Sequence, residues 1–322
     1  MTDSTTAVAD RLRIAVVGAG AVGGIFGARL TLAGHEVTFV VRPGTASVLH
    51  RDGLRIDSVQ GDVHLPVVTT AIDPAVVGPV DVVLVCVKAT QVAALAPSLR
   101  PLLAPHTLVV PTQNGVEAGV QLAAALGHGA VSDGVCRVIA ELAAPGHVRH
   151  MAVTPLLEFG ARATGPLDAA VRSTVDRFAA ALSGAGLAAL VPADMGVALW
   201  EKFLFIEPMG VVGAVARQPY GVLRRVPETR ALLDAALEEV MAVGTAAGIA
   251  WPSEAKARVW QRYDALPAGG YTSMARDLMA GRPSEYEAQT GAVIRLAGTL
   301  GVTVPVHTVL HAVLTPTAVA AS

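Results

Sequence analysis

Residues 11–44 carry the clearest pattern of hydrophobic and polar positions in the chain. Residues 14–17 are a short apolar run, which is typical of a strand buried on both faces of a parallel sheet. A helical pattern follows as far as Leu32, Gly34 ends it, and residues 37–41 form a second apolar run. This order predicts a strand, a helix and a second strand in one βαβ unit.

Apolar runs continue the pattern as far as Pro192. Strands are expected over residues 81–88, 107–111, 130–141, 148–159 and 187–191, with a minor hairpin over 54–66. Helical patterns occupy residues 89–103, 116–126 and 168–183. Beyond Pro192 only helical patterns remain, over residues 195 to beyond 212, 228–247, 253–263, 273–280, 284–300 and 307–314.

This change of pattern predicts two domains. Residues 1–192 are expected to form a Rossmann-type, doubly wound α/β domain, and residues 193–322 an all-α domain for substrate binding and dimerisation. A chain of 322 residues is long enough for two such cores.

Three glycines follow the first strand in the spacing G-x-G-x-x-G. Gly18 permits a tight turn, Gly20 lets a pyrophosphate approach the backbone, and Gly23 lets helix and strand pack closely. The free backbone N–H groups at the helix start, at Ala21 and Val22, are expected to face the phosphates. A glycine-rich loop without a ligand is the alternative, but the complete βαβ context favours dinucleotide binding.

Arg42 at the end of the second strand narrows the choice of cofactor. An NAD-binding unit usually has Asp or Glu there, which accepts a hydrogen bond from the ribose 2′-OH. A guanidinium pairs with a 2′-phosphate, whereas a carboxylate repels it. The sequence therefore predicts NADP(H), the alternative being that Arg42 is only a solvated charge at a strand end.

Composition excludes several classes of protein. The net charge of −2 suggests neither a nucleic-acid nor an anionic-membrane partner. Cys86 and Cys136 lack metal-site or redox spacing and are interpreted as core thiols in a reducing compartment. None of the nine histidines sits in a convincing metal-ligand pair, so no metal is expected. The apolar run over residues 14–28 fits the βαβ unit better than a signal peptide, and a cytoplasmic protein is expected.

Two candidate polar groups follow strands of the predicted parallel sheet. Lys88 and Asn114 lie where carboxyl ends of strands assemble α/β sites. Asn114 with Gly115 is alternatively only a turn pair.

Two more candidates lie in the helical half. Lys202 shares a helix face with Leu199, Ile206 and Gly210, and a lysine facing a cleft has its pKa lowered toward acid–base use. Its alternative is a lysine that snorkels to solvent. Glu285 is expected in the first turn of a helix, with a capping box formed by Ser284 and Glu287; a plain first-turn glutamate is its alternative.

An ordered set of motifs joins these candidates: VGAGAVGG, the Arg42 strand end, VCVKATQ, PTQNGV, WEKFLF and SMARDL…RPSEYE. In this set the chain resembles the ketopantoate reductases (2-dehydropantoate 2-reductases) over nearly its whole length. The resemblance implies reduction of 2-dehydropantoate to (R)-pantoate with NADPH, a step of pantothenate biosynthesis. It also implies roles for five residues: Lys202 as the catalytic lysine, Glu285 as the active-site glutamate, Asn114 near nicotinamide and substrate, Ser273 on the substrate carboxylate, and Lys88 at the cofactor end of the site.

Three positions depart from the family pattern. Ile206 and Gly210 stand where the family commonly has asparagines that help to hold the substrate, and Pro305-Val306-His307 stands for its Pro-x-Asn. Ile206 and Gly210 are expected to border the substrate, and each lost amide removes hydrogen bonds of roughly 0.5–1.5 kcal/mol. Ile206 is expected to favour an apolar branch beside the ketone, and Gly210 to add room.

The sequence therefore predicts an NADPH-dependent reductase of a small 2-oxo acid, with 2-dehydropantoate as the leading substrate and a homodimer as a possible assembly. One alternative is a related reductase of a less polar ketone or imine. A non-catalytic NADPH sensor is another, against which the presence of both Lys202 and Glu285 argues.

Overall fold

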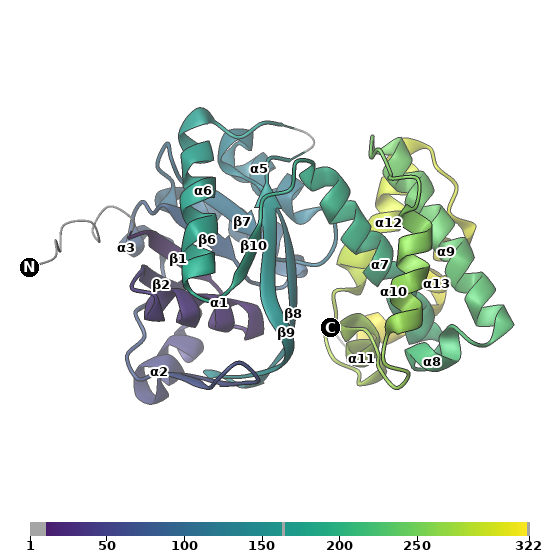
Figure 1. Cartoon of the computed structure of the whole chain (residues 1–322), viewed down its shortest axis with the longest axis horizontal. Helices are drawn as coiled ribbons and strands as arrows, with labels where there is room; N and C mark the ends of the chain where they lie inside the picture. The colour runs from purple at the N-terminus through teal and green to yellow at the C-terminus, as the bar shows by residue number, and fades with distance from the viewer. Residues whose placement is uncertain (1–10, 163–164, 321–322) are drawn as a thin grey trace, which may run out of the picture. The chain divides into compact units, whose positions relative to one another are not determined.

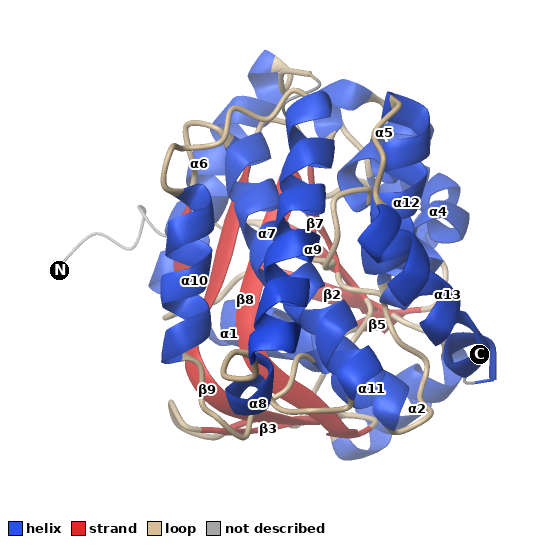
Figure 2. Cartoon of the chain, turned by 90° about the vertical axis from the view of Figure 1, so that its right-hand side faces the viewer, coloured by secondary structure: helices blue, strands red, loops and turns tan. Residues whose placement is uncertain are grey.

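The computed structural model describes residues 11–162 and 165–320, and the chain divides into two compact units. The first unit comprises Met1–Gln113 and Ala118–Met195, and the second comprises Asn114–Glu117 and Gly196–Ser322. Strands occur in the first unit, whereas the described part of the second unit contains only helices and their connections (Figures 1 and 2). The predicted fold class, a parallel-sheet domain followed by an all-α domain, is confirmed.

A five-stranded parallel sheet forms the centre of the first unit. Its strands, in spatial order, are β5 (Thr70–Ala71), β2 (Glu36–Val40), β1 (Arg13–Val17), β6 (Val82–Val85) and β7 (Leu108–Pro111). The register aligns Val17 with Val40 and Val85, and Val85 with Pro111, so the carboxyl ends of four strands lie along one edge.

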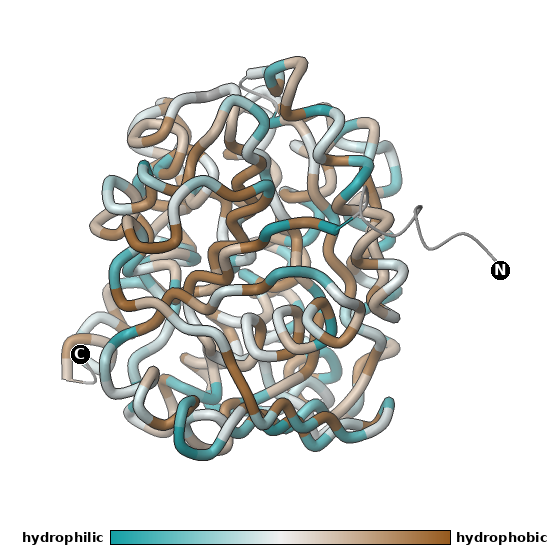
Figure 3. The backbone as a smooth tube through the Cα atoms, turned by 90° about the vertical axis from the view of Figure 1, so that its left-hand side faces the viewer, coloured by the Kyte–Doolittle hydropathy of each residue, from teal (hydrophilic) through white to brown (hydrophobic). Residues whose placement is uncertain are grey.

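Both faces of this sheet are covered, which explains why its strands are continuous apolar runs. Ile14 and Val16 point into one core, and Ala15 and Val17 point into another on the opposite face. Figure 3 colours the chain by hydropathy and shows hydrophobic segments alternating with hydrophilic ones along it. The prediction of a doubly wound sheet is confirmed.

The first unit also contains a second sheet of five strands. Its path is β10 (Ala188–Leu190), β9 (His147–Gly160), β3 (Leu54–Ser58) and β4 (Val63–Leu65), and β8 (Asp133–Ala144) pairs with β9. The minor hairpin expected over residues 54–66 is present as the antiparallel pair of β3 and β4.

The helices of the first unit connect these strands. They are α1 (Ala21–Leu32), α2 (Pro43–Asp52), α3 (Pro74–Val77), α4 (Ala89–Leu95), α5 (Ala118–Leu126) and α6 (Ala169–Gly184), with 3₁₀ turns η1 (Ala96–Leu102) and η2 (His128–Ala130). The helix expected over residues 89–103 changes to a 3₁₀ helix where prolines enter it. Sequence patterning missed α2, a short helix with only two buried side chains.

Helices α7 to α13 follow the last strand. Their bounds are α7 (Met195–Ala216), α8 (Tyr220–Leu223), α9 (Pro227–Ala246), α10 (Ala255–Ala265), α11 (Ser273–Met279), α12 (Tyr286–Leu300) and α13 (Pro305–Ala320). All six expected helices are present, and the short α8 was not predicted. No helix within the described ranges is long and apolar enough to cross a bilayer.

Candidate functional site

The glycine-rich turn after β1 has the geometry that the motif predicts. Gly18 has a φ of +99°, which favours glycine. A Cβ added to Gly23 would lie 2.0 Å from the carbonyl oxygen of Gly18, so a side chain there would force strand and helix apart. Gly20 precedes the first residue of α1, and a Cβ added there would meet no atom within 4 Å. The N-terminus of α1 is therefore open to a phosphate group.

Arg42 stands in a setting that fits a 2′-phosphate. Its exposed side chain follows β2, and the residue is the N-cap of α2, which begins at Pro43. The first turn of α2 holds no acidic residue, so the positive end of its dipole is not neutralised there. A guanidinium beside a helix N-terminus is a donor set suited to a phosphate. The pattern of residues 43–52 does not reveal α2, so the sequence predicts only Arg42 for this role.

Lys88 lies outside β6, contrary to the expectation that this strand extends over residues 81–88. The strand ends at Val85, and Lys88 is the exposed N-cap of α4. The side chain of Gln113 bonds to the segment before Lys88, since its Nε2 donates to the carbonyl oxygens of Val85 and Val87, both at 2.8 Å. These bonds help to hold the loop that presents Lys88.

Asn114 and Glu285 come together in the second unit although they lie 171 positions apart. The Nδ2 atom of Asn114 donates to Oε2 of Glu285 at 2.9 Å. Gly115 has a φ of +101°, and a Cβ there would lie 2.4 Å from the carbonyl oxygen of Ala288. The Asn-Gly pair is therefore a turn packed against α12, and its amide is also directed at a carboxylate.

The capping box predicted at this helix is wrong. Glu285, rather than Ser284, is the N-cap of α12. The carboxylate of Glu287 contacts Arg295 at 3.3 Å and His311 at 3.3 Å, so these partners hold it at the helix surface.

Lys202, Ile206 and Gly210 recur at intervals of four residues on α7, as expected. Lys202 is 7% exposed. Gly210 does not add room: a Cβ there would lie 2.7 Å from Cε of Met274 and 3.5 Å from Oγ1 of Thr272. Ser273, between these two residues, is the first residue of α11, so the structure brings its position close to this end of the Lys202 face.

Pro208 interrupts the backbone hydrogen bonds of α7 close to Lys202. Its ring has no N–H to offer the carbonyl of Leu204. The hydroxyl of Tyr263 compensates, lying 2.9 Å from the carbonyl oxygen of Phe205 and 3.5 Å from that of Leu204. Burial, followed by the negative charge of Glu207, raises the pKa of Tyr263 well above its ordinary value, so the phenol stays a donor.

A buried polar cluster, which we call the carboxylate–histidine cluster, joins Glu207, Glu239, Thr290 and His307. In the sequence, His307 stands out only as a departure from the family pattern, and no local motif marks the other three residues. Nε2 of His307 lies 2.8 Å from Oε2 of Glu207, and its Nδ1 lies 2.7 Å from Oε2 of Glu239. Thr290 Oγ1 donates to Oε1 of Glu207 at 2.9 Å.

The carboxylates and the histidine of this cluster stabilise each other's charged forms. Burial would lower the pKa of His307, but the charge of Glu207 and hydrogen bonds to Glu207 and Glu239 raise it to about 9. Burial likewise opposes ionisation of Glu239, but bonds from His307 and Val306 outweigh it and lower the pKa of that carboxyl. With both ring nitrogens facing carboxylates, His307 is an imidazolium at neutral pH.

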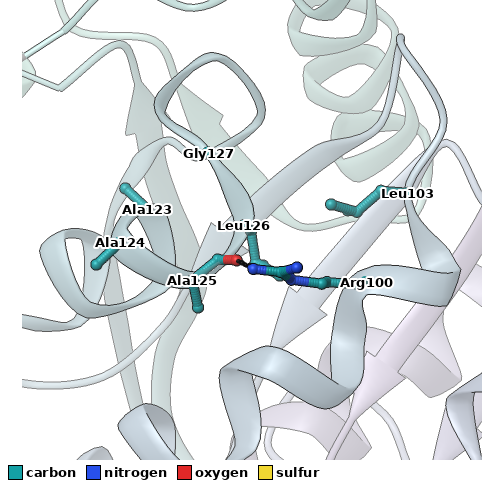
Figure 4. Close-up of a pocket in the computed structure, with 7 residues that line it drawn as sticks. All are labelled: Arg100, Leu103, Ala123, Ala124, Ala125, Leu126 and Gly127. Carbon is teal, nitrogen blue, oxygen red and sulfur yellow. Dashed lines mark hydrogen bonds between the residues drawn. The ribbon is translucent and has the colours of Figure 1, made fainter.

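A separate pocket of about 590 Å³ lies in the first unit (Figure 4). Nε and Nη2 of Arg100 donate to the carbonyl oxygen of Ala125 at 3.1 and 2.9 Å. An arginine that satisfies a carbonyl in the last turn of α5 has a structural role. The other lining residues are Leu103 and residues 123–127, and no predicted site residue is among them.

Neither cysteine of the chain forms a disulfide. Cys136 is buried, and burial raises the pKa of the Cys86 thiol. Among the residues described, no group of three or more His, Cys, Asp and Glu side chains could hold a metal ion.

Comparison with known proteins gives matches along both units. The family model "Ketopantoate reductase PanE/ApbA" matches residues 14–163, and the model "Ketopantoate reductase PanE/ApbA C terminal" matches residues 194–318. A 2-dehydropantoate 2-reductase of Mycobacterium tuberculosis is 31% identical over 298 residues, covering 92% of this chain and 95% of the relative. An uncharacterised oxidoreductase of Bacillus subtilis, YkpB, is 26% identical and covers 94% and 97%.

Solved structures agree with these matches. A PanE/ApbA family ketopantoate reductase from Ralstonia eutropha is 32% identical, covers 95% of this chain and 98% of that one, and has a TM-score of 0.83. A D-mandelate dehydrogenase solved with NADH has a TM-score of 0.83 at 20% identity, a likeness of fold alone.

Proposed function

The chain belongs to the ketopantoate reductase family, and on that premise we propose that it uses NADPH to reduce 2-dehydropantoate, a small 2-oxo acid, to (R)-pantoate, with Lys202 as the general acid. Family membership makes the protein an oxidoreductase that takes a nicotinamide dinucleotide. Our proposal adds three points to family membership: the substrate, the preference for NADPH and the role of Lys202.

The first unit holds the cofactor in this proposal. The N–H groups at the start of α1, at Ala21 and Val22, bind the pyrophosphate, and Gly18, Gly20 and Gly23 allow its approach. Arg42 pairs with the 2′-phosphate, and Lys88 serves the same cofactor from the loop after β6. Bound NADPH supplies the hydride for the carbonyl carbon.

The second unit supplies the acid. Lys202 donates a proton to the carbonyl oxygen as that oxygen gains negative charge, so the ketone gains one hydride and one proton and becomes an alcohol. The carboxylate of Glu285 helps to keep Lys202 protonated, and Asn114 orients that carboxylate. Ser273, at the first residue of α11, contacts the substrate carboxylate.

The observation that carries the proposal is the hydrogen bond of 2.9 Å between Asn114 and Glu285. Asn114 follows the last strand of the parallel sheet, and Glu285 begins a helix far along the chain. A fold that needed only a turn at Asn114 and Gly115 would not require an amide aimed at a carboxylate. The bond therefore supports a shared task for the two residues.

The test is the loss of NADPH absorbance with 2-dehydropantoate, with its analogue lacking the hydroxyl, and with a panel of other 2-oxo acids. Turnover of 2-dehydropantoate in preference to the panel is the expected result. Turnover of another ketone or an imine alone would reassign the substrate, and NADPH binding without turnover of any compound would indicate a sensor. Assembly as a homodimer stays a prediction, which light scattering of the purified protein tests.

A further inference from the structure

The carboxylate–histidine cluster (Glu207, Glu239, Thr290 and His307) connects the two helices that carry the proposed acid and its carboxylate partner. Lys202 and Glu207 lie on α7, five residues apart. Glu285 is the N-cap of α12, and Thr290 lies five residues further on. At a rise of about 1.5 Å per residue, the bond from Thr290 to Glu207 lies roughly 7–8 Å along each helix from these groups.

Burial of the charged groups of this cluster carries a desolvation penalty, so we expect the cluster to serve a purpose other than stability. The side chains of Glu207 and His307 are fully buried, and that of Glu239 is 10% exposed. Replacement of such buried ionic groups by apolar residues is often neutral or stabilising in proteins. A fully hydrogen-bonded cluster instead selects one arrangement of the elements that it joins. Here those elements are α7, α9, α12 and α13.

α7 needs such a restraint near Lys202. Pro208 removes a backbone hydrogen bond from the turn that links Lys202 to Glu207. Tyr263 satisfies the carbonyl of Phe205, but it belongs to α10, so its bond does not determine where α7 lies along α12. Thr290 does, because its hydroxyl bonds to one oxygen of Glu207 while His307 holds the other.

We propose that Thr290 is a positioning residue for the reduction: through Glu207, held by His307 and Glu239, it sets the position of the Lys202 segment of α7 relative to the start of α12. The kinetic part of this inference rests on the proposed function. The structural part does not, because it concerns only how two helices are held.

The test compares two substitutions at Thr290. Thr290→Val keeps the shape and removes the donor, whereas Thr290→Ser keeps the donor. Thr174→Val is the matched control, since Thr174 is equally buried in the first unit and its hydroxyl donates to the carbonyl oxygen of His106 at 2.8 Å. Each variant is measured for thermal stability, for hydrogen exchange along α7 and α12 without substrate, and for steady-state kinetics.

Thr290→Val is expected to lower kcat about tenfold or more, because small displacements of reacting groups cost large factors in rate. KM for NADPH should stay within about twofold, since the cofactor is assigned to the first unit. Exchange should rise in the Lys202 segment of α7 and in the first turns of α12. Thr290→Ser should restore both kcat and protection, and Thr174→Val should lose stability without either change.

Unchanged exchange in α7 and α12 of Thr290→Val would overturn the inference, and so would an equal loss of kcat in Thr174→Val. If the unmodified protein fails to reduce 2-dehydropantoate, the proposed function fails, while the exchange measurement still decides whether Thr290 holds the helices. If Thr290→Val does not fold, Thr290→Ala is the second variant. It leaves space for a water molecule to satisfy Glu207 but has no bond to α12, so the same results are expected.

Discussion

The imidazolium of His307 makes the second unit sensitive to alkaline pH. Its pKa rises from 6.5 to about 9 because the charge of Glu207 and hydrogen bonds to both carboxylates outweigh its burial. A histidine with a raised pKa stabilises the fold fully below its unfolded pKa, and that contribution is lost as the pH rises through the folded value. At 1.36 kcal/mol per pKa unit, His307 contributes about 3 kcal/mol at pH 6.5 or below.

The other shifted pKa values around the cluster, those of Glu239, Tyr286 and Tyr263, lie outside this interval. The pKa of Glu239 is lowered despite its burial, so its contribution is present above the ordinary value of 4.5 and is lost only as the pH falls through the folded value. Burial raises the pKa of Tyr286 to about 12, and that of Tyr263 lies well above its ordinary value. Between pH 6.5 and about pH 9, His307 is therefore the member of this set that loses its charge, and a comparison with a variant at this position isolates its contribution.

Tryptophan fluorescence isolates this effect, since all three tryptophans, Trp200, Trp251 and Trp260, lie in the second unit. The free energy of unfolding is measured with urea through this signal. Between pH 6.5 and pH values above about 9, it should fall by about 3 kcal/mol more in the unmodified protein than in His307→Gln. The variant keeps a polar side chain but cannot carry the charge.

His150→Gln is the control for loss of a buried histidine. His150 lies in the first unit, and its ring forms hydrogen bonds with the hydroxyl of Ser58 and with the backbone carbonyls of Ala152 and Val153. Its substitution should leave the pH dependence of the tryptophan signal unchanged. Equal pH dependence in the unmodified protein and in His307→Gln would refute the reasoning, because the charge of His307 would then contribute nothing.

Three further predictions concern the proposed reaction. Arg42→Ala should remove most of an at least tenfold preference for NADPH over NADH, about 1.4 kcal/mol, in cofactor titrations; equal affinities in the unmodified protein would contradict it. Lys202→Ala should lower kcat by about 10²–10⁴ with NADPH affinity unchanged, and its loss should be non-additive with that of Glu285→Ala; near-normal turnover would remove the lysine from the mechanism. Ile206→Asn should raise kcat/KM for 2-dehydropantoate relative to the dehydroxylated analogue, whereas Gly210→Asn should impair both, because another side chain fills that space; no change of the ratio in Ile206→Asn would show that other residues bind the hydroxyl.

The sequence predicts those parts of the fold that rest on local patterns. Residues 14–17 indicate a strand covered on both faces, and the structure places alternate side chains of β1 in two cores. Gly18 and Gly23 are required by the turn itself. The helix α2 was not predicted, because it buries only Ala46 and Leu49 and its apolar periodicity is too weak to detect.

For the candidate site, too, local patterns predict some features and not others. Lys202 and Glu285 could be named as candidates because each stands in a recognisable local motif, but the bond between Asn114 and Glu285 depends on how the chain folds back on itself. Gly210 could not be interpreted correctly from the sequence. A glycine in a helix suggests free space beside it, but Met274 of another helix occupies that space.

Pro208 explains why the position of Lys202 could not be predicted from the sequence of α7 alone. A proline in the middle of a helix weakens the backbone hydrogen bonds that would otherwise hold Lys202 in place. The segment is instead held from outside, by the hydroxyl of Tyr263 and by the bond from Thr290 to Glu207. These partners come from helices that follow α7 in the chain, and no spacing within α7 reveals them. The accuracy with which Lys202 is placed therefore depends on buried contacts that arise only when the helices pack.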